Sequence, residues 1–175
     1  MRRWPAACAS FLAAACVPLA AWAQTPPERP GGWTPKAPVE ARRFLAATAN
    51  PHATDAAYAM LARGGSAVDA AIAAQLVLGL TEPQSSGLGG GAVMLVHQAR
   101  GSRLHAYDGR ETAPAAARPE RFVDDAGRPL AFADVVATGV AVGVPGTMAV
   151  LGLAHARHGR LAWRALFEPA IALAE

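Results

Sequence analysis

Residues 82–114, EPQSSGLGGGAVMLVHQARGSRLHAYDGRETAP, set the organisation of the chain. This stretch opens with the glycine-rich loop 87–91, continues as an apolar run, and turns at Arg100-Gly101-Ser102. The return segment ends on a charged tip, residues 108–111. Glycines at this density allow positive φ angles and close approach of other segments. The pattern predicts a glycine loop that leads into a β-hairpin, with Arg110 at the end of the second strand.

Two helices are predicted before this stretch. Asn50-Pro51 supplies an N-cap and a proline at the first helical position, and Gly64-Gly65 supplies a stop. Ser66 starts the second helix, with Asp69 as its capping-box partner, so Asp69 is interpreted as a cap rather than a general acid or base. Residues 70–80 are apolar almost all round, which predicts a buried helix.

The remaining elements are predicted from shorter patterns. Residues 44–49 and 140–144 are apolar and are predicted to be strands. A helix is predicted from about residue 147 to 157, and residues 163–175 begin further helix. Because the sequence stops there without a cap, we expect the polypeptide to continue beyond Glu175.

The first 23 residues have the form of an export signal. Met1-Arg2-Arg3 is basic, residues 11–21 are apolar, and Ala21-Trp22-Ala23 fits a cleavage site before Gln24. The apolar part is too short to span a bilayer comfortably. We expect a periplasmic or secreted protein with no membrane span. Lipid attachment at Cys16 is the alternative.

The composition of the cleaved chain limits its chemistry. Both cysteines, Cys8 and Cys16, precede the cleavage site, so disulfides, thiolate nucleophiles and cysteine metal sites are excluded after cleavage. The net charge falls from +3 to +1, because two of the 16 basic residues are lost and 14 then face 13 acidic ones. No basic block remains, so no nucleic-acid partner is predicted. Residues 24–40 form a Pro-rich linker.

The sequence of residues 82–114 resembles that of the γ-glutamyltransferase (γ-glutamyltranspeptidase) family. EPQSSGLGGG, an apolar strand and DGRETAPAAA together make a long and specific combination. Further matching segments are GGSAVDAA at 64–71, VPGT at 144–147 and PAIALAE at 169–175. The resemblance implies an α+β fold, part of a four-layer α/β/β/α sandwich of the amino-terminal-nucleophile hydrolase type that is incomplete in this chain. Residues 41–175 would be the amino-terminal part of the large subunit.

Arg110 is the candidate substrate-binding residue. From the residues alone, an arginine beside Glu111 is typical of a surface ion pair. The resemblance implies instead that Arg110 binds the α-carboxylate of a γ-glutamyl substrate, for which a guanidinium is suited because it pairs bidentately and stays charged. Asp108 and Glu111 would orient Arg110 rather than react.

Other polar residues are assigned structural roles. The 87–91 loop lacks the phosphate-binding patterns and is interpreted as a close-packed loop, and neither Ser85 nor Ser86 fits a nucleophile elbow. Two histidine pairs could suggest a metal but lack supporting ligands, and are interpreted as exposed residues: His155 with His158, and His97 with His105 across the hairpin. No metal site and no cofactor is predicted.

The resemblance places the nucleophile outside this chain. In the family it is the amino-terminal threonine of the small subunit, freed when the precursor cuts itself. No threonine between Thr34 and Thr147 has that context, so this chain alone is expected to be inactive. The full enzyme would cleave glutathione and other γ-glutamyl amides and pass the γ-glutamyl group to water or to an amino acid or peptide acceptor. The missing carboxy-terminal part would be its partner.

Two alternatives remain open. One is a cephalosporin acylase or a relative that cleaves poly-γ-glutamate, since Arg110 does not settle the leaving group. The other is a non-catalytic exported scaffold module. A threonine at an autoprocessing junction downstream would support an enzyme, and its absence would support the scaffold.

Overall fold

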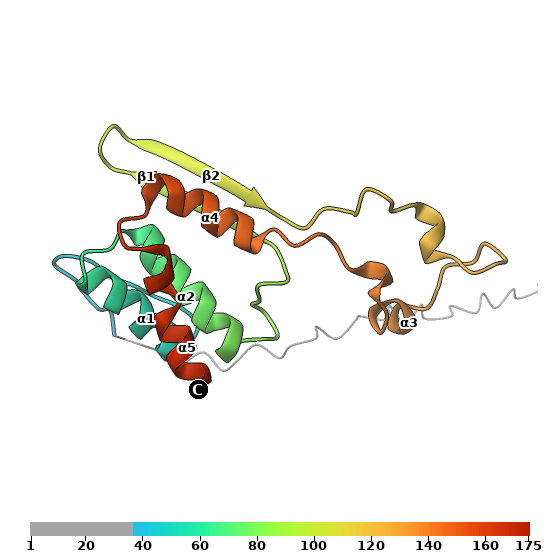
Figure 1. Ribbon diagram of the computed structural model, residues 1–175, viewed down its shortest axis with the longest axis horizontal. Helices are drawn as coiled ribbons and strands as arrows, with labels where there is room; N and C mark the ends of the chain where they lie inside the picture. Colours follow the sequence, from blue (N-terminus) through green and yellow to red (C-terminus); the bar gives the residue numbers. More distant parts are fainter. Residues whose placement is uncertain (1–36) are drawn as a thin grey trace, which may run out of the picture. The chain divides into compact units, whose positions relative to one another are not determined.

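The computed structural model describes residues 37–175 (Figure 1). The chain divides into two units, Met1–Glu40 and Ala41–Glu175. All described helices and strands belong to the second unit. The predicted leader and most of the predicted linker lie outside the described residues. Within residues 37–175, no helix is long and apolar enough to cross a membrane.

The first two helices begin where the sequence predicts them. Helix α1 spans Pro51–Ala62, and the side chain of Asn50 accepts the backbone N–H of His52 at 3.0 Å. Helix α2 spans Ala67–Thr81, and its capping box is complete. The Ser66 N–H donates to Asp69 Oδ2 at 2.7 Å, and the Asp69 N–H donates to Ser66 Oγ at 3.1 Å. Both predicted caps are confirmed.

Helix α2 is the centre of the helical core, as its apolar sequence predicts. It contacts α1, helix α4 (Thr147–His158), helix α5 (Glu168–Ala174) and the short 3-10 helix η3 (Trp163–Leu166). A helix covered on several sides needs no polar face. The large side chains buried in this core are Met60, Ile72, Val77, Val150, Leu151 and Leu166.

The hairpin predicted after the glycine loop is confirmed. Strand β1 (Ala92–Gln98) pairs antiparallel with β2 (Arg103–Gly109), and Ala92 lies opposite Gly109. One face of the hairpin contacts α4 and buries Tyr107. The other face leaves Val93, Leu95 and Leu104 about two-thirds exposed, at 66%, 65% and 65%. The hairpin therefore has one apolar face without a covering layer among the described residues.

Neither of the two other predicted strands forms within residues 37–175. Residues 44–48 form no strand, and residues 140–144 contain a 3-10 turn, Gly139–Ala141, followed by a single bridge between Val144 and Thr112. A strand requires a hydrogen-bonded neighbour. Neither segment has one within residues 37–175. The chain is α+β, as predicted, with two described strands.

Residues 113–143 leave the core and return to it. They contain the 3-10 helix η1 (Pro119–Phe122) and the short helix α3 (Phe132–Val136). No residue of this segment is buried, and Phe132 is 83% exposed. The segment therefore contributes no core of its own and serves to bring Val144 back beside Thr112.

Candidate functional site

Arg110 lies directly after β2, with its side chain 80% exposed. Its backbone N–H donates to Asp108 Oδ1 at 2.9 Å, and its Nη1 lies 3.3 Å from Glu111 Oε2. Asp108 therefore fixes the backbone of Arg110, whereas Glu111 contacts the guanidinium. The guanidinium is free to meet a further anion, because a single ion pair uses only part of its donor fork.

Glu111 occupies a pocket made of glycines. A Cβ added at Gly91 would lie 2.5 Å from Glu111 Oε2, and one added at Gly143 would lie 2.9 Å from Glu111 Cβ. Gly90 also approaches, since its Cβ would stand 3.4 Å from Oε1. The predicted close packing of the glycine loop is therefore confirmed at its end. Gly87 at the loop's start faces open space.

The start of α4 is attached to the same loop. Gly90 O accepts the backbone N–H groups of Gly146 and Thr147, each at 3.1 Å. Gly109 and Gly146 are packed so closely that a Cβ on either would overlap the other's backbone. The loop, the end of β2 and the start of α4 thus form one rigid corner beneath Arg110. We call this set of residues, Gly90, Gly91, Gly109, Arg110, Glu111, Gly143 and Gly146, the glycine corner.

Two buried oxygens in or beside the glycine corner have no hydrogen-bond partner among the described residues. They are Glu111 Oε2 and Thr147 Oγ1. Glu111 Oε2 is close enough to Arg110 for an ion pair but is not aligned for a hydrogen bond. Buried polar atoms are usually paired, so unpaired ones indicate an unmet contact. The start of α4 adds a positive dipole end to the charge of Arg110.

Gln75 on α2 is hydrogen-bonded to the segment that comes directly before the glycine loop. Its Nε2 donates to Ser86 Oγ at 2.7 Å, and the Ser85 N–H donates to Glu82 O at 3.1 Å. The Ser86 side chain and the Ser85 backbone are thus each held by a local hydrogen bond. Gln75 is the one polar side chain of the apolar run 70–80, and a lone polar residue on a buried helix requires a partner, which is the signal by which this contact could have been found.

Asp69 is a cap for two segments rather than one. It is fully buried, and Oδ2 accepts the N–H groups of Arg160 at 2.9 Å and Leu161 at 3.3 Å as well as that of Ser66. Burial alone would raise the pKa of the Asp69 carboxyl, but these hydrogen bonds together outweigh it and hold the pKa below its usual value. The predicted cap is confirmed, and its second partner lies far along the chain.

The interpretation of His155 and His158 as exposed residues is wrong. His155 Nε2 lies 2.9 Å from Leu161 O and 3.6 Å from Asp69 Oδ1, and its ring packs edge-on against Trp163. Both histidines are partly buried because this face of α4 packs on the hairpin and the α2 start. Residues 37–175 contain no group of three or more His, Cys, Asp or Glu side chains that could hold a metal ion.

His158 joins a polar cluster under the hairpin. Its Nε2 lies 2.8 Å from the Tyr107 hydroxyl, its Nδ1 lies 3.4 Å from Gln98 Nε2, and its ring centroid is 5.0 Å from that of His105. Burial, then the charges of His105 and Arg157, lower the pKa of His158. His105 thus meets His158 and not His97, because His97 pairs with Leu104 on the opposite face.

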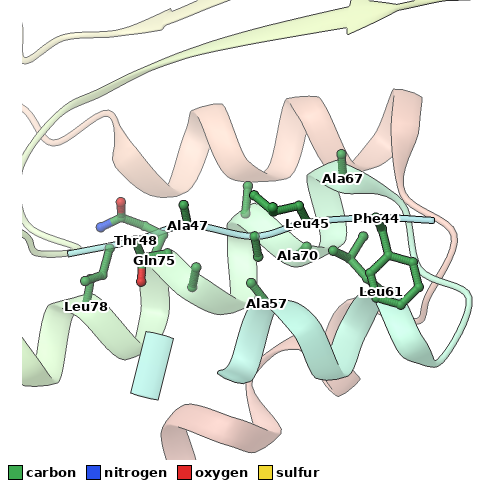
Figure 2. A pocket seen from close by; sticks show the side chains of 13 residues that line it. Phe44, Leu45, Ala47, Thr48, Ala57, Leu61, Ala67, Ala70, Gln75 and Leu78 are labelled. Atoms are coloured by element: carbon green, nitrogen blue, oxygen red, sulfur yellow. The ribbon is translucent and has the colours of Figure 1, made fainter. Parts of the chain in front are cut away.

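An apolar cavity lies elsewhere, on the helical side of the chain. It has a volume of about 480 Å³ and is lined by residues 44–48 together with α1 and α2. Figure 2 shows residues 44–48 running nearly straight along the two helices, with Gln75 at one side. No ionisable group lines this cavity. It therefore offers no means of recognising a charged amino-acid substrate, and Arg110 remains the better candidate.

Comparison with known proteins identifies the family. The sequence profile described as "Gamma-glutamyltranspeptidase" matches residues 53–175. The chain belongs to the γ-glutamyltranspeptidase family. It is 39% identical over 165 residues to the glutathione hydrolase proenzyme of Bacillus subtilis strain 168, which covers 94% of this chain and 28% of that protein.

Solved structures of γ-glutamyltranspeptidases resemble it as well. The Helicobacter pylori enzyme matches with a TM-score of 0.74 and 32% identity, over 79% of this chain and 39% of that one. The Pseudomonas nitroreducens enzyme in complex with L-DON matches with a TM-score of 0.70 and 32% identity, over 78% of this chain and 40% of that one. The chain therefore spans well under half the length of these γ-glutamyltranspeptidases.

Proposed function

We propose that this chain is the amino-terminal part of a γ-glutamyltransferase precursor, and that Arg110 binds the α-carboxylate of the γ-glutamyl substrate. The observation that carries the proposal is the exposed Arg110 guanidinium on the rigid glycine corner of a γ-glutamyltranspeptidase-family chain. A substrate carboxylate can accept two parallel hydrogen bonds from the Arg110 guanidinium while Glu111 stays paired with another of its N–H groups and holds it in place.

The glycine corner positions Arg110 for this role. Glu111 cannot shift toward Gly91 or Gly143 without meeting backbone, and Gly90 ties the corner to the start of α4. Precise placement matters because a bound substrate must present its γ-carbonyl to a nucleophile at a fixed distance. We infer that Glu111 is a positioning residue that holds the guanidinium facing the substrate.

The reaction requires residues that follow Glu175 in the precursor. We propose that a threonine hydroxyl attacks the γ-carbonyl, that the hydroxyl proton passes through the threonine's own amine to the departing amine, and that an acyl-enzyme forms. Water or the amine of an acceptor amino acid or peptide then attacks the ester and releases the threonine. Residues 37–175 contribute binding of the substrate carboxylate and no nucleophile.

The open faces of this chain support a four-layer sandwich in the complete protein. The apolar hairpin face at Val93, Leu95 and Leu104 is suited to packing against a second sheet. Residues 44–47 make no backbone hydrogen bond within the described part of the chain, as expected of a strand whose neighbour lies further along the precursor. We further propose that the leader directs the protein to the periplasm or the medium.

Two substrate analogues test the proposal in the full-length protein. A γ-glutamyl anilide is compared with a 4-aminobutanoyl anilide, which lacks the α-carboxylate, and a glutaryl anilide, which lacks the α-amine. We expect strong preference for the γ-glutamyl anilide, with the largest loss of kcat/KM for the 4-aminobutanoyl compound. Equal rates on all three would overturn the proposed role of Arg110. Preference for the glutaryl compound or a cephalosporin amide would favour the acylase alternative.

A further inference from the structure

Residues 130–142, LAFADVVATGVAV, are almost without charge and yet lie at the surface. Asp134 is the one ionisable residue among these thirteen, and none of the thirteen is buried. Phe132 is 83% exposed, and Val136 and Val142 are 60% and 61% exposed. Contiguous exposed apolar residues mark interaction sites, whereas single ones are common on any protein surface. We call residues 130–142 the apolar segment.

The residues that precede the apolar segment have the composition of a surface that faces water. Residues 114–129 contain six ionisable residues among sixteen, and none of the sixteen is buried. The six are Arg118, Glu120, Arg121, Asp124, Asp125 and Arg128. The two parts of this excursion are therefore both exposed but differ in chemistry. The general exposure of a loop does not account for the apolar composition of its second part.

Local hydrogen bonds give the excursion a definite shape where the apolar segment begins. The backbone N–H of Arg128 donates to Asp124 Oδ1 at 2.9 Å, and the Arg128 Nε donates to Asp124 Oδ2 at 2.8 Å. The Leu130 N–H donates to Phe122 O at 2.9 Å. A closed turn thus leads into the apolar segment and fixes the direction in which it starts.

The helix within the apolar segment lacks the packing that a short helix needs. Helix α3 has five residues, and its N-cap residue, Ala131, makes no side-chain capping hydrogen bond. Isolated helices of this length are unstable in water, and most helical stability in proteins comes from packing of an apolar face. Phe132 and Val136 are four residues apart and so share one face. No residue of α3 is buried within residues 37–175, so that face has no covering partner there.

The apolar segment ends beside the candidate substrate site. The Val144 N–H donates to Thr112 O at 2.8 Å, so the excursion leaves and rejoins the chain at neighbouring points. Gly143, which directly follows the apolar segment, belongs to the glycine corner. In the function proposed above, the part of the precursor beyond Glu175 must reach the same place, because it brings the nucleophile to a substrate held by Arg110.

We propose that the apolar segment is the docking surface for the part of the precursor that follows Glu175, an inference that rests on the proposed function. The chain spans 28% of the Bacillus subtilis relative, so most of a precursor of that length lies outside this chain. A second copy is a poorer partner, because it would stand at the glycine corner where the remainder of the precursor is needed. Docking buries Phe132 and Val136 and gives α3 its missing packing.

Photo-crosslinking from position 132 of the full-length protein identifies the partner. Phe132 is replaced by p-benzoylphenylalanine, which retains the phenylalanine ring and on irradiation captures the group that it touches. Unlabelled and isotope-labelled copies are mixed in equal amounts before irradiation, and crosslinked peptides are mapped by mass spectrometry. We expect crosslinks to peptides from beyond Glu175, each carrying a single isotope, because the partner belongs to the same copy.

The other outcomes of this experiment each overturn the proposal. Crosslinks that join labelled to unlabelled peptides would assign the apolar segment to an interface between copies. Crosslinks confined to residues 37–175, or no crosslink, would show that nothing beyond Glu175 covers it. The same reagent in place of the exposed Ala126, in the charged part of the excursion, is the matched control and should capture no peptide from beyond Glu175.

Substitutions on α3 provide a second measurement that needs no crosslinker. Phe132→Ser with Val136→Ser should lower the urea midpoint for unfolding of the full-length protein, because a buried apolar contact is lost. Phe132→Leu with Val136→Ile keeps apolar side chains at both positions and should retain most of the midpoint. If the apolar segment faced water in the full-length protein, the serine pair would leave the midpoint unchanged, and that result would refute docking.

The crosslink and the enzymatic activity report on different proposals. The crosslink requires no substrate, so Arg110→Lys should leave the capture from position 132 intact. A protein that crosslinks as expected but shows no preference for γ-glutamyl substrates would retain the docking surface and lose the proposed function. A protein with that preference in which position 132 reaches nothing beyond Glu175 would retain the function and lose the docking surface.

Discussion

The buried carboxylate of Asp69 accepts the backbone N–H of Arg160, 91 residues further along the chain, at 2.9 Å. The same oxygen, Oδ2, accepts the Ser66 N–H at the start of α2. One side chain therefore joins the beginning of the central helix to the segment that follows α4. This contact makes Asp69 important to the assembly of the core and not only to its own helix.

Replacing Asp69 should destabilise the full-length protein. Asp69→Ala leaves the part-buried N–H groups of Ser66, Arg160 and Leu161 without their acceptor, which should cost about 2–4 kcal/mol. Asp69→Asn retains an oxygen and should cost less. Urea unfolding of both variants gives the comparison, with Asp55→Ala on the exposed side of α1 as the control. A loss no larger than that of the control would mean that water replaces the carboxylate.

Acid should remove the contribution of Asp69. The pKa of its carboxyl is lower in the folded protein than the usual value of 3.8, so the folded state holds this proton more weakly than the unfolded state. Its stabilisation is therefore complete above about that pH and is lost as the pH falls through the folded pKa. Unfolding free energies between pH 5 and pH 3 should decline less in Asp69→Asn than in the wild type.

The two partners of Asp69 mark what the sequence can and cannot reveal. The contact with Ser66 spans three residues, and a capping box is a local pattern that any reader of the sequence can find. The contact with Arg160 depends on where α4 ends in space, which no local pattern specifies. The same limit applies to His158, whose partners Gln98 and Tyr107 follow from the strand register.

The sequence predicts which residue is the candidate site, Arg110, but it does not predict how the residues around Arg110 pack. Arg110 could be selected because the surrounding motif resembles a family, and its exposure agrees with either of its sequence interpretations. The pocket around Glu111 could not be predicted, because Gly143 reaches it only after the 113–143 segment returns. Residues 44–49 failed as a predicted strand for a related reason: strand structure depends on a partner as well as on the residues themselves.

The glycine corner should not tolerate side chains. Gly91→Ala would place a methyl group 2.5 Å from Glu111 Oε2, and Gly146→Ala would overlap the backbone of Gly109. Each should cost about 1–3 kcal/mol and displace Arg110. Gly87→Ala faces open space and is the control. The expected result is a reduced kcat/KM for γ-glutamyl substrates in the first two variants alone, and a loss of similar size in Gly87→Ala would show that the whole loop is sensitive.

Mild acid should loosen the hairpin from α4 through His158. When the His158 ring is neutral, Gln98 can donate to His158 Nδ1 while His158 Nε2–H donates to the Tyr107 hydroxyl. The pKa of His158 is lower than its usual value of 6.5, so the unfolded state binds this proton more tightly. The stabilisation is complete above about pH 6.5 and is lost as the pH falls through the folded pKa.

The groups that face His158 are His105, Gln98 and Tyr107 from the hairpin and Arg157 from α4. Protonation therefore adds a charge beside cations, with no carboxylate among them. Unfolding between pH 7.5 and pH 5 should lose more stability in the wild type than in His158→Asn. The exposed His52→Asn is the control. Identical slopes in wild type and His158→Asn would show that this cluster does not titrate.

Residues 44–47 should become protected from hydrogen exchange in the proposed full-length precursor. They form no backbone hydrogen bonds within residues 37–175, so their amides should exchange rapidly in the isolated chain. If they pair with a strand from beyond Glu175, exchange should slow by several orders of magnitude in the full-length protein. Hydrogen exchange with mass spectrometry measures both, with the exposed residues 114–129 as the internal reference. Equally fast exchange in both proteins would contradict the proposed sandwich.

Arg110→Lys gives the sharpest test of the substrate site. Lysine keeps the positive charge but lacks the planar fork, so it can meet the α-carboxylate at one point and cannot hold Glu111 in the same way. Loss of a charge-assisted contact costs about 1.5–3 kcal/mol, or roughly ten- to a hundredfold in kcat/KM. That loss should be confined to the γ-glutamyl anilide, since the 4-aminobutanoyl anilide has no carboxylate for Arg110 to bind.

Autoprocessing should proceed normally, because the Arg110 side chain is 80% exposed and no core residue rests on it. The ratio of the two substrates' losses, measured in wild type and variant, isolates the contact between arginine and carboxylate. If both substrates lose activity equally, or the precursor fails to process, Arg110 is a structural partner of Glu111 and the carboxylate is bound elsewhere.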